Sequence, residues 1–390
     1  MIVKNNGMGD LTRKRMAVAA YYFVPGVVFA SWASRIPDIK HLLHLGNGQL
    51  GTVLFAIPIG QLLMMAFSGV LVNKFGSKKM LILSEVLYAA VLFCIGCSST
   101  VAALTAALVG FGMMANLMNI ATNTQACLVE KMYGRNIMSS FHGLWSLGGF
   151  AGGIIGALFA NTLLPIEVHY AAVLALSLII LAAGLRFLVN DTTAKAEEED
   201  VPKFSFKTID PVLFLLGLMG FAGMFCEGAV YDWSSVYFAS VVKPDEAFVR
   251  AGYIAGMGAM TLGRFFADGF VTKYGPSRVL KTCGALIVTG LWMAAALPWL
   301  VPATLGFLIV GFGISSSVPI CYSIAGKLGT VKASIAITIV SSISFFGFLV
   351  GPPVIGWLSE VTGLRIALSI AACLGLMIAF VSVKVSKRLS

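Results

Sequence analysis

Long runs of hydrophobic residues alternate with short polar segments along the whole chain. A helix needs roughly 20 apolar residues to cross the hydrocarbon layer of a membrane, and about twelve runs reach that length. The pattern therefore predicts an all-α membrane protein with twelve transmembrane helices. The predicted spans are residues 16–36, 49–72, 79–97, 101–128, 137–163, 168–189, 209–239, 248–272, 279–299, 303–326, 333–358 and 364–384.

The second half of the chain repeats the first at a spacing of about 200 residues. The tetrapeptide "VGFG" occurs at Val109–Gly112 and again at Val310–Gly313. The octapeptide "KFGSKKML" at Lys74–Leu81 resembles "KYGPSRVL" at Lys273–Leu280. Matches that keep their order and spacing indicate two homologous halves of six helices each.

The boundary between the halves is a polar and charged segment at residues 190–208. We interpret it as a cytoplasmic linker between an N-terminal bundle, residues 1–189, and a C-terminal bundle, residues 209–390. Two parallel six-helix repeats are typical of secondary transporters, in which the bundles rock about a central substrate site.

Composition supports a membrane protein, because 58% of the residues are hydrophobic and only 11% are charged, against about 25% charged in soluble domains. The net charge of +10 would suggest nucleic-acid binding in a soluble protein. With the N-terminus inside, however, most of the 27 Lys and Arg residues fall on the inner side, which is the positive-inside pattern. We therefore expect a multi-pass protein of the bacterial inner membrane with both termini cytoplasmic, and no nucleic-acid partner. The first apolar run has a counterpart in the second half, so we interpret it as a retained helix and not a cleaved signal peptide.

The stretch "GVLVNKFGSKK" at Gly69–Lys79 resembles the signature loop between the second and third helices of the major facilitator superfamily, and this resemblance covers the whole chain. Other stretches resemble the YbjJ-like branch of that superfamily, which is grouped with fucose permease-like sugar transporters. They are "WASRIPDI" (Trp32–Ile39), "NIATNTQACLVE" (Asn119–Glu130), "HGLWSLGG" (His142–Gly149), "EGAVYDW" (Glu227–Trp233) and "GFLVGPPVIG" (Gly347–Gly356).

The resemblance implies a cytoplasmic lock that holds one conformation of the transporter. Its residues in this chain are Gly69, Asn73, Gly76, Lys78, Arg264 and Asp268. The family usually has Asp where this chain has Asn73, and an amide brings no charge, so the lock in the first half should be weaker. Arg264 and Asp268 lie four residues apart on one helix face and can pair. The branch often has an acid at the position of Asn119, so its absence puts a proton site there in doubt.

Glu227 is the deepest acidic residue of the seventh predicted span, about 24 Å from Pro211 along a helix. Ionisable groups inside a membrane are functional candidates, because their charge is expensive there. We expect Glu227 to bind and release the proton that drives transport. The alternative is a structural carboxyl group that is hydrogen-bonded to a neighbouring helix.

Two charges of opposite sign lie at the outer ends of helices that correspond in the repeat, Arg35 on the first and Asp232 on the seventh. A pair between Arg35 and either Asp232 or Glu227 could close an outer gate and break when the gate opens. The alternative is a surface ion pair that contributes little.

Polar residues on otherwise apolar spans are the candidates for substrate contact. They are Asn116, Asn119 and Asn123 on the fourth span, His142, Trp145 and Ser146 on the fifth, Trp32 and Tyr22 on the first, and Tyr231 on the seventh. Amides beside aromatic rings suit sugar-like ligands. The same side chains could instead join helices to one another by hydrogen bonds.

We find no nucleophile motif, phosphate-binding glycine loop or metal-ligand pattern, and expect no enzyme activity, no cofactor and no metal. The sequence favours a monomeric, lipid-embedded transporter of a small polar organic solute, with a sugar or sugar derivative as substrate and protons as the coupling ion. An exporter of drugs or metabolites, and a receptor that has lost transport, remain as alternatives.

Overall fold

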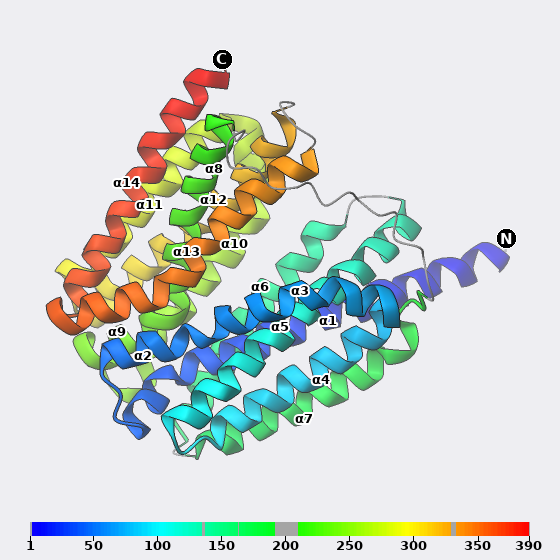
Figure 1. Ribbon diagram of the computed structural model, residues 1–390, viewed down its shortest axis with the longest axis horizontal. Coiled ribbons are helices and arrows are strands. Elements are labelled where there is room, and N and C mark those ends of the chain that lie inside the picture. Colours follow the sequence, from blue (N-terminus) through cyan, green and yellow to red (C-terminus); the bar gives the residue numbers. More distant parts are fainter. Residues whose placement is uncertain (1, 135–136, 163, 192–209, 329–332, 390) are drawn as a thin grey trace. The chain divides into compact units, whose positions relative to one another are not determined.

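The computed structural model describes residues 2–134, 137–162, 164–191, 210–328 and 333–389 (Figure 1). This part of the chain contains helices and no strands. The α-helices are α1 (Ile2–Leu42), α2 (Asn47–Leu54), α3 (Ala56–Phe75), α4 (Ser77–Gly96), α5 (Val101–Tyr133), α6 (Met138–Ala160), α7 (Ile166–Gly184), α8 (Pro211–Gly228), α9 (Ser234–Tyr237), α10 (Ala251–Tyr274), α11 (Pro276–Ala296), α12 (Leu300–Lys327), α13 (Ala333–Thr362) and α14 (Leu364–Leu389).

Every predicted span coincides with helix, although two of the spans are interrupted. The second consists of α2 and α3, and in the seventh α8 and α9 are joined and followed by two π-helical segments, η3 (Ala229–Trp233) and η4 (Phe238–Val242). In the described part of the chain, eleven helical segments are long and apolar enough to cross a membrane. The remaining predicted span is α10, which carries the charge of Arg264 within it.

The chain divides into two compact units that are not continuous in sequence. One contains Met1–Arg35 and Ala56–Glu199, and the other contains Ile36–Phe55 and Asp200–Ser390. The sequence predicts residues 36–55 to belong to the N-terminal bundle, whereas in the structure this segment groups with the second half of the chain. The contacts of its side chains with α10 and α13, described below, are the physical reason.

Within each unit, glycine allows two helices to cross closely at corresponding positions of the repeat. A Cβ atom on Gly148 of α6 would lie 2.1 Å from the carbonyl oxygen of Phe23 on α1. In the other unit, a Cβ atom on Gly347 of α13 would lie 2.1 Å from the carbonyl oxygen of Phe221 on α8. Small residues permit this approach of backbones, which is a common way to pack helices in membranes.

Proline residues lie beside the two points at which the chain enters and leaves the segment 36–55. The helix breaks at Phe55, between α2 and α3. Pro58 follows three residues later, and it cannot donate a hydrogen bond to the carbonyl of Leu54, which explains the break. Pro37 likewise removes a hydrogen bond from α1 just after the passage at Arg35 and Ile36.

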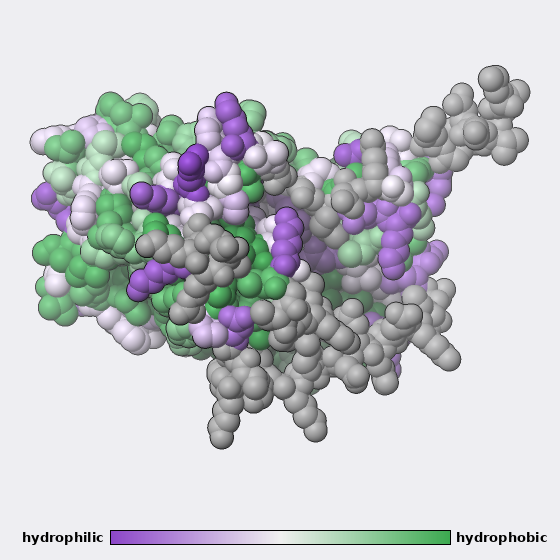
Figure 2. All heavy atoms as spheres, turned by 90° about the horizontal axis from the view of Figure 1, so that it is seen from above, coloured by the Kyte–Doolittle hydropathy of each residue, from purple (hydrophilic) through white to green (hydrophobic). Residues whose placement is uncertain are grey.

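The surface is unlike that of a soluble protein. Hydrophobic residues cover broad areas of the face in Figure 2 and are interrupted by hydrophilic patches. Large apolar side chains that are more than half exposed include Phe67, Phe265, Phe266 and Phe380. Such a surface is stable when lipid covers it.

Candidate functional site

The main charge cluster of the second unit is built around Glu227. This residue is one of the last in α8, a helix that begins where Asp210 accepts a hydrogen bond from the backbone of Val212. The Glu227 carboxylate accepts hydrogen bonds from the Tyr231 hydroxyl at 2.7 Å and from the guanidinium of Arg264 at 3.0 Å. Glu227 is only 8% exposed. The carboxyl group of Glu227 is therefore held in a buried site by a cation and a phenol.

Arg264 was expected to belong to the cytoplasmic lock as a partner of Asp268. In the structure its guanidinium contacts Glu227 of α8 at 3.0 Å, and the pairing with Asp268 stays a prediction. The side chain of Asp268 lies outside the described residues. The contact between Arg264 and Glu227 joins two helices through opposite charges, each of which would be costly to bury alone.

The two residues expected at the outer gate have different surroundings. Arg35 is buried and donates a hydrogen bond to the Leu164 carbonyl, 3.1 Å away in its own unit. Asp232 is buried within η3, and among the described residues it has no hydrogen bond or ion pair. Glu227 is the other expected partner of Arg35. Its carboxylate accepts hydrogen bonds from Arg264 and Tyr231.

A different ion pair attaches the segment 36–55 to the second unit. Arg250, at the start of α10, is 1% exposed. One guanidinium nitrogen lies 2.6 Å and 2.5 Å from the two carboxylate oxygens of Asp38. The sequence gives no sign of this pair, because Arg250 is one of several cations in loops, although Asp38 lies in the "WASRIPDI" stretch.

Further contacts attach α2 to α13 in the same unit. The Glu360 carboxylate accepts a hydrogen bond from the backbone N–H of Gly48 at 2.8 Å, and the Trp357 indole donates to the Thr52 hydroxyl at 3.1 Å. A Cβ atom on Gly51 would lie 2.8 Å from the carbonyl oxygen of Pro352. We call residues 36–55 the clasp segment, because an ion pair and close helix packing together attach it to the second unit.

Four of the predicted substrate residues meet in the first unit. The Tyr22 hydroxyl donates to the side-chain oxygen of Asn123 at 2.6 Å, and the Asn123 amide donates to the side-chain oxygen of Asn119 at 2.7 Å. The His142 ring lies edge-on to the Tyr22 ring, with centroids 5.3 Å apart. We call these four residues the amide cluster. Asn119 and His142 are exposed, so the cluster presents polar groups at an accessible surface.

The other predicted substrate residues lie apart from the amide cluster. Asn116 accepts a hydrogen bond from Ser68 on α3 at 2.7 Å, and Ser146 is buried, with its hydroxyl turned toward the His142 carbonyl. Trp145 lies beside Phe29. Trp32 is fully buried, which argues against a contact with substrate in this conformation.

The signature loop in the first unit depends on a residue that the sequence analysis placed in the linker. Asp191 accepts hydrogen bonds from the backbone N–H groups of Ser77 at 2.8 Å and Lys78 at 3.3 Å. Its carboxylate thereby caps the N-terminus of α4, where negative charge is stabilised. Gly76 precedes this turn with a φ of 86°, a conformation that favours glycine.

The remaining lock residues of the first unit are less constrained. Asn73 is exposed, and Gly69 has open space where a Cβ atom would be. Gly275 repeats the positive φ of Gly76 in the second unit, at 80°. The backbone of this loop is thus repeated in both halves.

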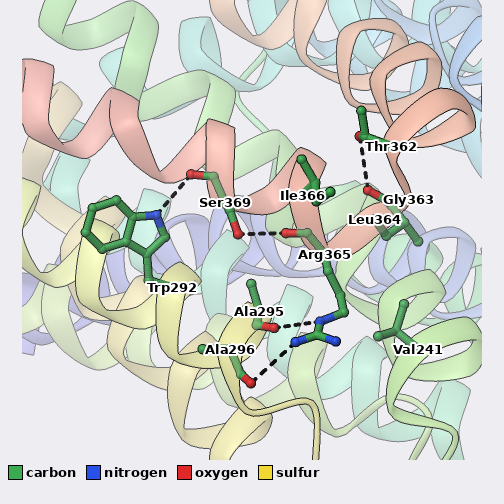
Figure 3. A pocket seen from close by; sticks show the side chains of 10 residues that line it. All are labelled: Val241, Trp292, Ala295, Ala296, Thr362, Gly363, Leu364, Arg365, Ile366 and Ser369. Atoms are coloured by element: carbon green, nitrogen blue, oxygen red, sulfur yellow. Dashed lines mark hydrogen bonds between the residues drawn. The ribbon is translucent and has the colours of Figure 1, made fainter.

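A cavity of about 700 Å³ lies where the end of α11 meets the start of α14 (Figure 3). Arg365 donates to the carbonyl of Ala295 at 2.8 Å and points toward that of Ala296 at 3.5 Å. The indole of Trp292 donates to the Ser369 carbonyl at 3.0 Å. Arg365 therefore stabilises the C-terminal end of α11, where a cation is favourable.

Together, the helices, the apolar surface and the buried charges define a multi-pass membrane protein of the transporter class. Residues 18–335 match the sequence model of the Major Facilitator Superfamily. The chain belongs to this superfamily.

Sequence relatives support the same family over nearly the full length. An MFS-type transporter from Yersinia pestis is 33% identical over 359 residues, which cover 92% of each chain. The membrane protein MosC of Rhizobium meliloti is 30% identical, over 94% of this chain and 89% of that protein.

Solved structures of transporters share the fold. The nucleoside transporter NupG superimposes with a TM-score of 0.75 at 16% identity, over 96% of this chain and 99% of its own. The fucose:proton symporter FucP of E. coli superimposes with a TM-score of 0.61 at 15% identity, over 95% of this chain and 98% of its own.

Proposed function

We propose that this protein is a secondary active transporter that moves a sugar or sugar derivative across the bacterial inner membrane, coupled to protons through Glu227. The observation that carries the proposal is the buried carboxylate of Glu227, bound to Arg264 and Tyr231. Family membership supports transport as the activity. The distribution of basic residues supports cytoplasmic termini.

Glu227 has the contacts that a coupling carboxylate needs. When it is ionised, Arg264 balances its charge at 3.0 Å. When it binds a proton, it can keep a hydrogen bond with Tyr231, but its attraction for Arg264 is lost. Because Arg264 belongs to α10 and Glu227 to α8, protonation changes the force between two helices. A proton can thereby favour one packing of these helices over another.

The amide cluster supports a polyhydroxylated substrate. Asn119 and Asn123 each offer an amide donor and an acceptor, and Tyr22 contributes a hydroxyl beside an aromatic face. Sugars present hydroxyl groups that both donate and accept, together with apolar C–H faces that pack on rings. We propose that the substrate replaces hydrogen bonds that these residues now make with one another.

The clasp segment supports alternating access. It belongs to the first half of the sequence but is attached to the second unit by the Asp38–Arg250 pair and by Glu360. We propose that these contacts close the outer side and break when the protein opens outward. The gate formed by Arg35 with Asp232 or Glu227 remains a separate prediction.

Transport into liposomes with an imposed pH gradient tests the proposal, with sugars and sugar derivatives as substrates. We expect accumulation that depends on the gradient, and we expect Glu227→Gln to abolish accumulation while retaining exchange of substrate. Glu85→Gln is the matched control, because Glu85 is also a buried carboxyl group but has no hydrogen-bond partner among the described residues. Accumulation that survives in Glu227→Gln would contradict proton coupling at this residue. Efflux of lipophilic compounds would favour an exporter, and binding without flux would favour a receptor.

A further inference from the structure

A groove runs between α10 and α11 on the surface of the second unit. Both helices pack along α12 but make little contact with each other, so α12 forms the floor of the groove. The groove has a volume of about 560 Å³. Its walls include Phe266, Phe270 and Tyr274 of α10 and Leu286 of α11, and its floor includes Phe312.

The serine and threonine hydroxyl groups in the groove are satisfied within the protein. Ser315 donates to the Phe312 carbonyl at 2.7 Å, and Thr282 donates to the Arg278 carbonyl at 3.0 Å. The side chains of Ser315 and Ser316 lie within hydrogen-bond distance of each other at 3.1 Å. The groove therefore offers an apolar surface along its length, which suits a hydrocarbon chain.

Arg278 is the one charged residue that lines the groove, and it lies at one end. It is exposed and has no ion pair or hydrogen bond through its side chain among the described residues. The basic residues Lys273 and Lys281 lie near it in sequence, so the positive-inside pattern places this end at the cytoplasmic face. An unpaired guanidinium at that interface attracts the phosphate of an anionic lipid.

The start of α11 offers a second attraction for an anion. Its first turn contains no acidic residue, and no described side chain accepts hydrogen bonds from its free N–H groups. The corresponding helix of the first unit, α4, has the carboxylate of Asp191 at this position. Among the described residues, a carboxylate thus accepts from the start of α4 in one half, and none accepts from the start of α11 beside Arg278 in the other.

The length of the groove fits one leaflet of a membrane. Tyr274 and Gly263 are eleven residues apart on α10, or about 16 Å along a helix. Half of the hydrocarbon layer is about 15 Å thick. An acyl chain with its headgroup at Arg278 would therefore reach from the interface to about the middle of the membrane.

We propose that this groove is a binding site for one anionic phospholipid of the cytoplasmic leaflet, with an acyl chain on α12 and the phosphate between Arg278 and the start of α11. The site differs from the Glu227 cluster, and its existence does not depend on the substrate or on proton coupling.

Native mass spectrometry of the purified full-length protein tests this proposal with phosphatidylglycerol and phosphatidylcholine that carry the same acyl chains. We expect one phosphatidylglycerol to bind at concentrations at least tenfold lower than phosphatidylcholine needs. Arg278→Gln should remove this preference, whereas Lys281→Gln, which removes a nearby cation outside the groove, should keep it. Equal binding of the two lipids to the unchanged protein, or equal effects of the two substitutions, would overturn the proposal.

The acyl-chain part of the site has its own matched pair of substitutions. Thr282→Phe places a ring in the groove and should reduce binding of phosphatidylglycerol at least fivefold. Thr289→Phe adds the same ring to an exposed position of α11 outside the groove and should have no effect. If Thr282→Phe does not fold, phosphatidylglycerol with a photoreactive acyl chain should label the groove residues of the unchanged protein. Labelling spread evenly over all lipid-facing helices would then overturn the proposal.

Discussion

Glu227 and Arg264 lie on different helices of the second unit, and their charged groups are 3.0 Å apart in a largely buried site. Neither charge would be stable there alone, because desolvation of a single buried ion is costly. The pair therefore links the ionisation of Glu227 to the position of Arg264 on α10. The effect of removing one charge should therefore depend on whether the other is still present.

Arg264→Gln should destabilise the protein more than the double substitution Arg264→Gln with Glu227→Gln. The single change leaves a buried carboxylate without its cation, at a cost of up to about 3–5 kcal/mol, reduced here because the Arg264 side chain is 25% exposed. Thermal unfolding in detergent measures both variants. Equal losses of stability would mean that the two residues do not depend on each other.

Asp38→Asn should loosen the clasp segment. Arg250 would then be buried without a carboxylate, so α2 should separate from α13 more often. Hydrogen exchange of the α2 amides should become faster, and the exchanged pair Asp38→Arg with Arg250→Asp should reverse part of the effect. Asp10→Asn is the matched control, because the Asp10–Lys14 pair is exposed and contributes little. If the α2 amides exchange at the same rate after Asp38→Asn, the ion pair does not hold the clasp segment on the second unit.

Gly148→Ala should lower stability by about 1–3 kcal/mol, because its Cβ atom would meet the Phe23 carbonyl and force α1 and α6 apart. Gly69→Ala should be neutral or stabilising by about 0.5–1 kcal/mol, because its helical position has open space. Unfolding temperatures of the two variants provide the measurement. A large loss in Gly69→Ala would show that this glycine of the signature loop has a role beyond the described conformation.

Asp191→Asn should weaken the start of α4. An amide accepts hydrogen bonds but brings no negative charge to the helix N-terminus, so we expect a loss of about 0.5–1 kcal/mol. Asp191→Ala should cost more, about 1–2 kcal/mol, since it also removes the acceptors. Identical stability of all three proteins would exclude the cap as a stabilising contact.

Tyr22→Phe should reduce the affinity for substrate. Loss of one hydrogen bond of about 0.5–1.5 kcal/mol corresponds to a weakening of roughly 2- to 13-fold. Ligand-dependent thermal shifts give the affinity, and Ser68→Ala is the control, because it removes a bond to Asn116 outside the amide cluster. A similar loss of affinity in both variants would indicate an indirect effect on folding.

The sequence predicted the helices, the repeat and the superfamily, because hydrophobic run length and spacing are local properties of the chain. It also predicted Glu227 and the residues of the amide cluster as candidate functional residues, because polar side chains are rare within apolar helices. It could not assign their partners. Arg264 had a plausible partner one turn away on its own helix, and only the folded structure brings the carboxylate of Glu227 within 3.0 Å of its guanidinium.

The contacts of the clasp segment and of Asp191 were missed for a related reason. Arg250 resembled any cation of an outer loop, and Asp191 resembled the polar linker that follows it. Each acquires its partner from a residue more than a hundred positions away. No local pattern marks such pairs, so their discovery required the three-dimensional structure.

The helix break at Phe55 gives the clasp segment a mechanical property. Helix α2 has eight residues, so it is a rigid rod about 12 Å long with its pivot at Phe55. A turn of about 30° at that pivot would move the far tip of the rod by about 6 Å, which is more than the reach of any hydrogen bond or ion pair. A small local rotation beside Pro58 would therefore be enough to break the hydrogen bond between the Gly48 backbone and the Glu360 carboxylate.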